Sequence, residues 1–321
     1  CMKLRLIDHP IKIAVEQYDN LKNKLVNQLL AHNSVLSVYQ MGSVKEPGIS
    51  DLDIICVFKN DSDCMLNLRK ELSNDEKKVL THGIFGLEER DLKQAISFNL
   101  LSNLKFLGGK NLNLNKNEVI FNQDLRDQIA LEYMMKMFIT LDAQTKLGIV
   151  KLRSFLLLGK AIMFDLELLG IKNGNIFDFV NKVLYYRTIW YDDKPQEKKI
   201  EELILNFYVA LEEILIKTLE EKQFFLPYNE INLPGGFKIL KGELFQKNHK
   251  GLVLPSMFQF LGKKYINLQY RLNKFTYRVP YKLPNNDTFL FDRFKFSEQM
   301  VIKNRKSFPY FIQVTSSLSI Y

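Results

Sequence analysis

Long apolar runs are absent from this sequence of 321 residues. The longest, Phe155–Phe164, is interrupted by Lys160, whereas a helix that spans a membrane needs about 20 consecutive apolar residues. The first ten residues include Lys3, Asp8 and His9, so they lack the uninterrupted apolar core of a signal peptide. These absences predict a cytoplasmic protein without a membrane span.

Cysteine, proline and glycine are also scarce. The three cysteines form no Cys-x-x-Cys pair, which argues against a disulfide framework and against a thiolate zinc site. With 9 prolines and 15 glycines, long flexible linkers are not expected. Apolar residues make up 46% of the chain and charged residues 25%, which is typical of a folded protein with about two domains.

Acidic residues are scarce in the last third of the chain. Residues 227–321 hold 15 Lys and Arg against 5 Asp and Glu, a balance of +10, whereas the first 226 residues balance at −1. The same segment holds 18 of the chain's Phe and Tyr residues, which number 24 and 14. This composition is typical of surfaces that bind RNA or another polyanion. The alternative is a β-rich segment with an aromatic core and solvated lysines.

Apolar periodicity divides the chain into three parts. Residues 1–123 follow the order helix, strand, strand, helix, strand, which predicts a small α/β domain. Residues 124–226 carry long stretches with helical spacing and predict a helical bundle. Residues 227–321 contain repeated Pro, Gly and Asn breaks, so we expect an irregular, β-leaning segment. Within it, Tyr265–Leu272 alternates like a strand.

Three strands are expected in the first part, at Val35–Met41, Asp51–Phe58 and Ile84–Glu88. A helix over residues 11–32 precedes the first strand. Leu92–Leu107 is ambiguous between one helix and a helix followed by a strand.

The most informative stretch joins the first two expected strands. The first strand ends in Gly42 and Ser43, and the second opens with Asp51, Leu52 and Asp53. Because side chains two positions apart on a strand share a face, the two aspartates should project together. Neighbouring carboxylates raise each other's pKa, and a divalent cation removes that repulsion.

The Gly-Ser turn carries groups that suit a phosphate. Gly42 permits close approach of the backbone to a ligand, and Ser43 offers a hydroxyl and a backbone N–H to phosphate oxygens. Lys45 would add positive charge nearby. The alternative is a plain turn followed by a solvated start of a strand.

This arrangement resembles the signature of the nucleotidyltransferase superfamily typified by DNA polymerase beta and kanamycin nucleotidyltransferase. The shared pattern is an apolar residue before Gly-Ser, a loop, and then Asp-apolar-Asp-apolar, here Met41-Gly42-Ser43 and Asp51-Leu52-Asp53-Ile54. The resemblance implies that Gly42 and Ser43 bind nucleotide phosphates and that Asp51 and Asp53 ligate Mg²⁺ or Mn²⁺. It also implies an α/β (α+β) nucleotidyltransferase core with a small mixed sheet, followed by the helical bundle. Residues 227–321 lie outside the resemblance.

Members of this superfamily usually supply a third carboxylate from a later strand, as a metal ligand or general base. By resemblance, Glu88 at the end of the third expected strand takes that role, with Glu89 and Asp91 as the other candidates. His82 lies just before the same strand, where we expect a surface or capping role; the alternative is that it lines the cleft.

The resemblance implies a metal-dependent enzyme that moves a nucleoside monophosphate from a nucleoside triphosphate to an acceptor hydroxyl or phosphate and releases pyrophosphate. The acceptor stays open: it is a small molecule or sugar phosphate, or RNA bound through residues 227–321. The alternative is a catalytically degenerate module that retains the fold and binds nucleic acid or a protein partner.

Overall fold

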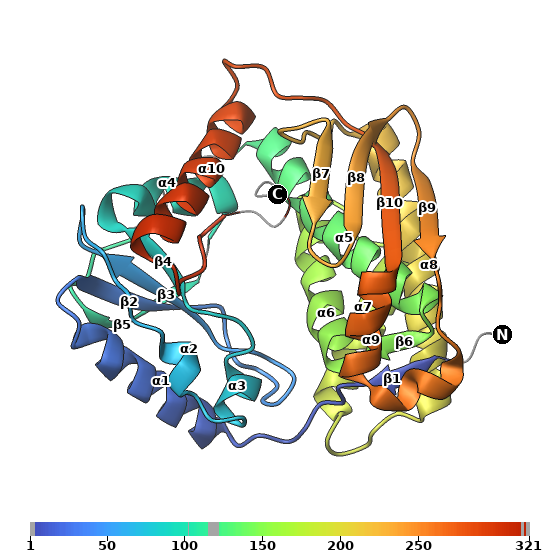
Figure 1. Cartoon of the computed structure of the whole chain (residues 1–321), viewed down its shortest axis with the longest axis horizontal. Helices are drawn as coiled ribbons and strands as arrows, with labels where there is room; N and C mark the ends of the chain where they lie inside the picture. The colour runs from blue at the N-terminus through green and yellow to red at the C-terminus, as the bar shows by residue number, and fades with distance from the viewer. Residues whose placement is uncertain (1–3, 102, 115–121, 316–317, 319–321) are drawn as a thin grey trace. The chain divides into compact units, whose positions relative to one another are not determined.

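The computed structural model of the chain describes residues 4–101, 103–114, 122–315 and 318. The chain divides into two compact units, each built from segments far apart in sequence (Figure 1). The bundle unit contains residues 1–10 and 123–291, and the sheet unit contains residues 11–122 and 292–320. The protein is therefore of the expected mixed α/β class, but its division differs from the three consecutive parts that the sequence predicts.

The sheet unit contains a four-stranded sheet with the order β4-β3-β2-β5. Its central strands, β2 (Val35–Met41) and β3 (Asp53–Phe58), are antiparallel neighbours. β4 (Phe85–Glu88) pairs parallel with β3, and β5 (Leu104–Gly109) pairs antiparallel with β2. β3 is almost wholly buried, which agrees with its continuous apolar sequence because both of its faces are covered.

Helices cover both faces of this sheet. α1 (Val15–Leu30) lies on one face, and α4 (Glu89–Asn99) and α10 (Phe289–Ser307) lie on the other (Figure 1). The chain between β3 and β4 forms the short helices α2 (Leu68–Glu71) and α3 (Glu76–Val79). α1 buries residues at the three-to-four spacing expected of a helix that faces a core: Tyr18, Leu21, Leu25, Val26 and Leu29.

The segment that follows α10, residues 308–314, packs onto the sheet of the sheet unit. The ring of Phe308 stacks on that of Phe58, with centroids 4.1 Å apart. The Gly86 N–H donates to the Ile312 carbonyl at 2.8 Å, so this segment covers the outer edge of β4. The prediction of one separate segment over residues 227–321 is therefore wrong. Its last part completes the sheet unit because its aromatic side chains bury against the β3–β4 pair.

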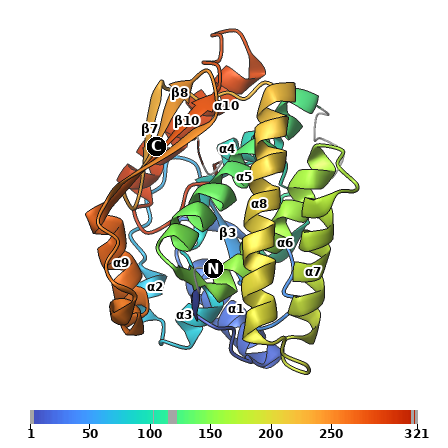
Figure 2. The ribbon, with the colours of Figure 1, turned by 90° about the vertical axis from the view of Figure 1, so that its right-hand side faces the viewer.

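The bundle unit is built on long helices that pack side by side (Figure 2). They agree with the helical stretches that the sequence predicts and are α5 (Gln123–Lys146), α6 (Leu152–Leu168), α7 (Asn175–Ile189) and α8 (Glu197–Glu221). β1 (Arg5–Ile7) pairs parallel with β6 (Ile149–Lys151), so the first described residues belong to this unit. In the described part of the chain, no helix has the length and hydropathy of a membrane span.

A second sheet in the bundle unit has the order β7-β8-β10-β9. Its strands are β7 (Glu230–Leu233), β8 (Phe237–Gly242), β9 (Gln246–Gly251) and β10 (Asn273–Pro280). Residues 227–291 therefore contain the β-strands that the sequence predicts for this part of the chain.

The connection from β9 to β10 is helical. It contains the 3₁₀ helix η2 (Ser256–Leu261) and α9 (Lys263–Leu272). The prediction of a strand over Tyr265–Leu272 is therefore wrong. Tyr265, Ile266 and Gln269 are buried at a spacing of one and four residues, which is the spacing of one helix face.

The buried carboxylate of Asp142 on α5 joins the bundle to the second sheet. The Tyr208 hydroxyl on α8 donates to Oδ1 of Asp142 at 2.6 Å, and the Tyr277 hydroxyl on β10 donates to Oδ2 at 2.8 Å. Lys247 Nζ on β9 donates to the Tyr208 hydroxyl at 2.9 Å. Burial, with the charge of Asp142, raises the pKa of both tyrosines, so their hydroxyls stay protonated as donors.

A second buried carboxylate, Asp165 on α6, makes the stability of the bundle unit depend on pH. Among the described residues, its Oδ2 has no hydrogen-bond partner. Burial raises the pKa of this carboxyl well above its usual value. Between the usual value of about 3.9 and the raised one, the folded state holds a proton that the unfolded state has released. The free energy of unfolding should therefore fall as pH rises through this window.

Asp165→Asn removes this titration. At neutral pH we expect the variant to be more stable than the wild type by about 1–3 kcal/mol, because the wild-type carboxyl must take up a proton on folding and the amide does not. The difference should shrink as pH falls toward about 4. Urea unfolding followed by the fluorescence of Trp190, the chain's single tryptophan and a buried residue of this unit, measures it. A difference that does not change with pH would contradict the assignment.

Candidate metal centre

Two aspartates lie at the start of β3, beside the end of β2. The two strands are antiparallel, with Met41 paired with Asp53. Gly42 and Ser43 follow β2 directly and are exposed at this edge of the sheet. Gly42 has a φ of +69°, a conformation that favours glycine. Asp51 precedes Asp53 by two residues, and oxygens of the two carboxylates lie within 4.8 Å of each other, as the strand period predicts.

The loop after Ser43 is held in place by helix α1. The Tyr18 hydroxyl donates to the Ser50 carbonyl at 2.6 Å and accepts from the Gly48 N–H at 2.9 Å. Gly48 and Ser50 are both buried, so these two contacts fix the part of the loop that leads into β3. Lys45 is exposed earlier in the same loop.

His82 joins the two aspartates from the neighbouring chain segment. The parallel pairing of β3 with β4 starts at Ile55 and Phe85, so residues just before β4 are level with the start of β3. His82 Nε2 lies 2.6 Å from Oδ1 of Asp53 and 3.7 Å from Oδ2 of Asp51. Its other ring nitrogen, Nδ1, is 2.7 Å from the carbonyl of Gly83, which fixes the orientation of the ring.

The surroundings of Asp51 and His82 shift the pKa of both groups. Burial and the charge of Asp53 raise the pKa of the Asp51 carboxyl, while the Thr81 hydroxyl donates to its Oδ2 at 3.1 Å. Burial acts to lower the pKa of His82, but the hydrogen bond to Asp53 and the charges of both aspartates outweigh burial and raise it. The cluster therefore carries two crowded carboxylates that positive charge stabilises.

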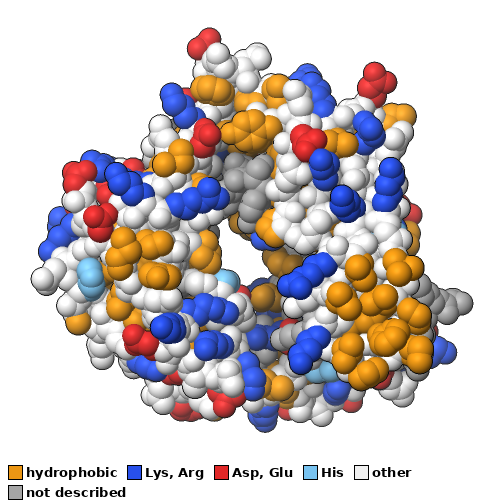
Figure 3. Space-filling view, in the orientation of Figure 1, with side chains coloured by type: hydrophobic (Ala, Val, Ile, Leu, Met, Phe, Trp, Pro, Cys, Tyr) orange, Lys and Arg blue, Asp and Glu red, His pale blue; other side chains and the backbone are white. Residues whose placement is uncertain are grey.

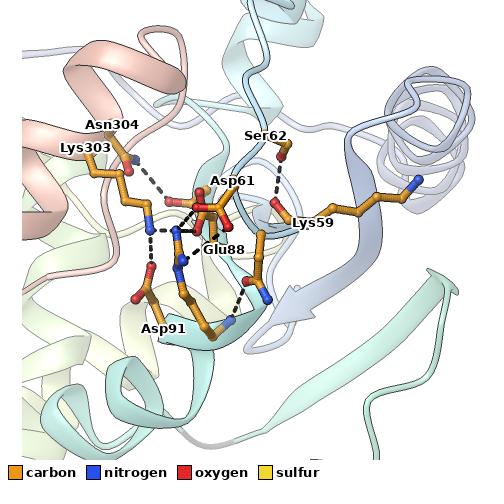
Figure 4. A network of polar contacts seen from close by, with 10 residues as sticks. Lys59, Asp61, Ser62, Glu88, Asp91, Lys303 and Asn304 are labelled. Carbon is orange, nitrogen blue, oxygen red and sulfur yellow. Dashed lines mark hydrogen bonds and ion pairs between the residues drawn. The ribbon is translucent and has the colours of Figure 1, made fainter.

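Glu88 does not belong to this cluster. In the parallel register it is level with Phe58, at the opposite end of β3 from Asp53, which is roughly 16 Å away at about 3.3 Å per residue. Its carboxylate is 2% exposed and lies 2.7 Å from both Lys303 Nζ and an Arg90 guanidinium nitrogen (Figure 4). The structure thus corrects the expected role of Glu88, which is held by structural ion pairs.

The other two candidates for a third carboxylate lie at the same far end. Asp91 is 2.8 Å from Lys303, and Glu89 is 3.1 Å from Lys110. Both residues lie in the first turn of helix α4, directly after β4, so neither lies near the start of β3.

His82 is a member of the cluster that its sequence position marked only as a surface, capping or cleft-lining residue. Its place follows from the parallel register between β3 and β4, which the two strand sequences do not specify on their own. The available signal was its position just before the third expected strand.

The donor set suits a divalent cation. Asp51, Asp53 and His82 each offer one ligand atom, these atoms lie within 4.8 Å of one another, and all three residues are partly exposed. Two carboxylates alone suit Mg²⁺, whereas an added imidazole favours Mn²⁺, Zn²⁺ or another transition ion. The two aspartates expected to bind a metal therefore lie together, and His82 adds a ring nitrogen that could serve as a further ligand.

No protein-family model, curated protein or solved structure matches this chain. What this site can do is therefore inferred from its own residues and their geometry.

Proposed function

We propose that the chain is a divalent-metal-dependent nucleotidyltransferase that acts at the β2–β3 edge of the sheet unit. The observation that carries the proposal is that an exposed Gly-Ser turn and the Asp51, Asp53 and His82 cluster adjoin one another there. The turn suits the phosphates of a nucleoside triphosphate, and the cluster suits the cation that accompanies them. The chemistry of that pairing is phosphoryl-type transfer.

Each residue then has a distinct part. Ser43 and the backbone of Gly42 bind phosphate oxygens, and Lys45 adds positive charge at the same edge. Asp51, Asp53 and His82 hold the cation, and Thr81 orients the Asp51 carboxylate through its hydrogen bond. When bound, the cation neutralises the charge that develops on the transferring phosphoryl group. The Tyr18 contacts keep the loop between turn and cluster in one conformation.

In the transfer step, an acceptor oxygen forms a bond to the α-phosphorus of the nucleotide. The bond from that phosphorus to the bridging oxygen breaks, and pyrophosphate leaves with the electron pair. The proton of an acceptor hydroxyl passes to solvent, because Asp53 and His82 are engaged in holding the cation. A small alcohol, a sugar phosphate and RNA all offer the hydroxyl that this step needs.

One observation favours the alternative, a catalytically degenerate module that retains the fold and binds nucleic acid or a protein partner. The described residues place no third carboxylate with Asp51 and Asp53, because Glu88 and Asp91 are engaged by Lys303 at the other end of β3. A domain that lacks its general base would retain binding and lose turnover.

Titration calorimetry of ATP, GTP, CTP and UTP, each with Mg²⁺, with Mn²⁺ and without metal, tests the proposal. We expect one or more nucleotides to bind only when a cation is present. Release of pyrophosphate in the presence of pooled alcohols, sugar phosphates or RNA would identify transfer. Binding without release from any acceptor would support the non-catalytic module. If no nucleotide binds under any metal condition, the transferase function is wrong, and only a degenerate module that binds nucleic acid or a protein partner is left.

A further inference from the structure

A long stretch of the bundle unit, residues 244–286, contains no acidic residue. Its basic residues are Lys247, Lys250, Lys263, Lys264, Arg271, Lys274, Arg278 and Lys282. Lys250 and Lys274 are exposed and directly opposite each other in the β9–β10 pair. Like charges at opposite positions destabilise an antiparallel pair. This surface therefore carries a local cost in stability, which an anionic ligand would offset.

Large apolar side chains are exposed on the same stretch. We call them the apolar patch, which consists of Leu252, Val253, Met257, Phe258, Phe260, Leu261, Leu268 and Leu272. Met257 is 72% exposed and Phe260 is 66% exposed. Figure 3 shows hydrophobic side chains gathered over η2 and α9, with Lys and Arg side chains at their border. A gathering of this kind marks an interaction site in a folded protein.

Hydrogen bonds hold the parts of the apolar patch together. The Tyr265 hydroxyl donates to the Leu254 carbonyl at 2.9 Å, and Asn273 Nδ2 donates to the Leu252 carbonyl at 3.1 Å. These bonds fix the segment before η2 against α9 and β10. Leu268 and Leu272, four residues apart, share the exposed side of α9. The segments that carry the patch are therefore fixed relative to one another by hydrogen bonds.

Basic and apolar side chains alternate on that helix. Lys264, Leu268, Arg271 and Leu272 are all exposed, whereas Tyr265 is buried beneath them. Exposed leucines combined with lysine and arginine on α9, next to the exposed phenylalanines of η2, are typical of segments that lie in a membrane interface.

Other partners fit these observations less well. RNA would use the basic side chains, but it gains little from contact with exposed aliphatic groups such as Met257 and Leu252. A second copy of the chain would bring the same positive charge to the contact and be repelled. Met257 and Phe260 are both more than half exposed and lie in a stretch without acidic residues, so an apolar phase bounded by phosphates matches both features.

We propose that the apolar patch and the lysines beside it bind the surface of an anionic lipid bilayer. The patch enters the boundary between headgroups and acyl chains, and Lys250, Lys264, Arg271 and Lys274 contact lipid phosphates. The chain is thereby held at a membrane surface without spanning it. This inference does not depend on the metal centre, which lies in the other unit.

Co-sedimentation of the full chain with lipid vesicles tests the proposal. We expect binding to vesicles of phosphatidylcholine and phosphatidylglycerol in equal parts, little binding to phosphatidylcholine alone, and weakening by salt. Lys250→Gln/Lys274→Gln should lower the partition constant by about fivefold for each charge removed. Met257→Asp/Phe260→Asp should lower it by about tenfold or more, because apolar area no longer enters the bilayer.

Val209→Asp is the matched control, since Val209 is 51% exposed on α8 of the same unit and lies outside the patch. It should bind vesicles as the wild type does. Circular dichroism and Trp190 fluorescence show whether each variant is folded, and the lysine variants replace exposed side chains that the fold does not need. Absence of binding by the wild type to anionic vesicles would overturn the proposal. Binding of RNA in place of vesicles, or a dimer abolished by Met257→Asp/Phe260→Asp, would do the same.

Discussion

Replacement of Asp51 and Asp53 together by asparagine should abolish metal-dependent nucleotide binding. Loss of a single group that only supports a metal ligand commonly costs 10–100-fold in affinity, so loss of both carboxylates should cost more than about 100-fold. Calorimetric titration of Mn²⁺, and of nucleotide in its presence, measures the change. His82 alone is too weak a site to retain the ion, because the two negative charges of the cluster are gone.

The same substitution should leave the fold intact. Burial and the charge of Asp53 raise the pKa of Asp51, which means that the charged pair is unfavourable without a cation. Thermal unfolding of the metal-free variant should therefore occur at the wild-type temperature or above it. Asp61→Asn/Asp63→Asn is the matched control, because it makes the same chemical change just beyond the other end of β3. Undiminished metal binding by the Asp51/Asp53 variant would rule out the proposed centre.

The second large effect is expected at Asp142 in the bundle unit. Asp142→Ala leaves the buried Tyr277 hydroxyl, the Tyr208 hydroxyl and the Lys146 ammonium without the carboxylate that they contact. Removal of one partner from a buried charged network typically costs about 3–5 kcal/mol. That is a large share of the stability of a typical domain.

Urea unfolding followed through Trp190 reports on this unit, because the chain has no other tryptophan. Asp124→Ala, an exposed position on the same helix, is the control and should change stability by less than about 1 kcal/mol. Tyr208→Phe and Tyr277→Phe should each cost about 1 kcal/mol, and their combination should not be additive because both hydroxyls share one carboxylate. A loss below about 1 kcal/mol for Asp142→Ala would show that the network does not hold sheet and bundle together.

Local patterns in the sequence determined much of this protein. The helices of the bundle follow from apolar residues every three to four positions, and β2 and β3 follow from short β-branched runs. The shared direction of Asp51 and Asp53 follows from the two-residue period of a strand. These features depend on residues a few positions apart, so the order of residues is enough to predict them.

The same local reasoning was wrong for α9. The alternation of apolar and polar residues over Tyr265–Leu272 suits a strand. The same segment also has the spacing of one helix face, which its buried residues Tyr265, Ile266 and Gln269 follow. Short apolar segments carry both periods, and contacts with distant parts of the chain decide between them. Here the Tyr265 hydroxyl bonds to Leu254 and fixes the helix against the segment before η2.

Only the tertiary structure determined which residues form the metal centre and which segments form the sheet unit. The parallel register of β3 with β4 brings His82 to Asp53 and carries Glu88 to the opposite end of the strand. There Lys303, 215 residues further along the chain, neutralises Glu88 and ties α10 to the sheet unit. Register and long-range ion pairs arise when distant segments pack together to bury apolar surface and pair their charges. A pattern confined to neighbouring residues does not contain that information.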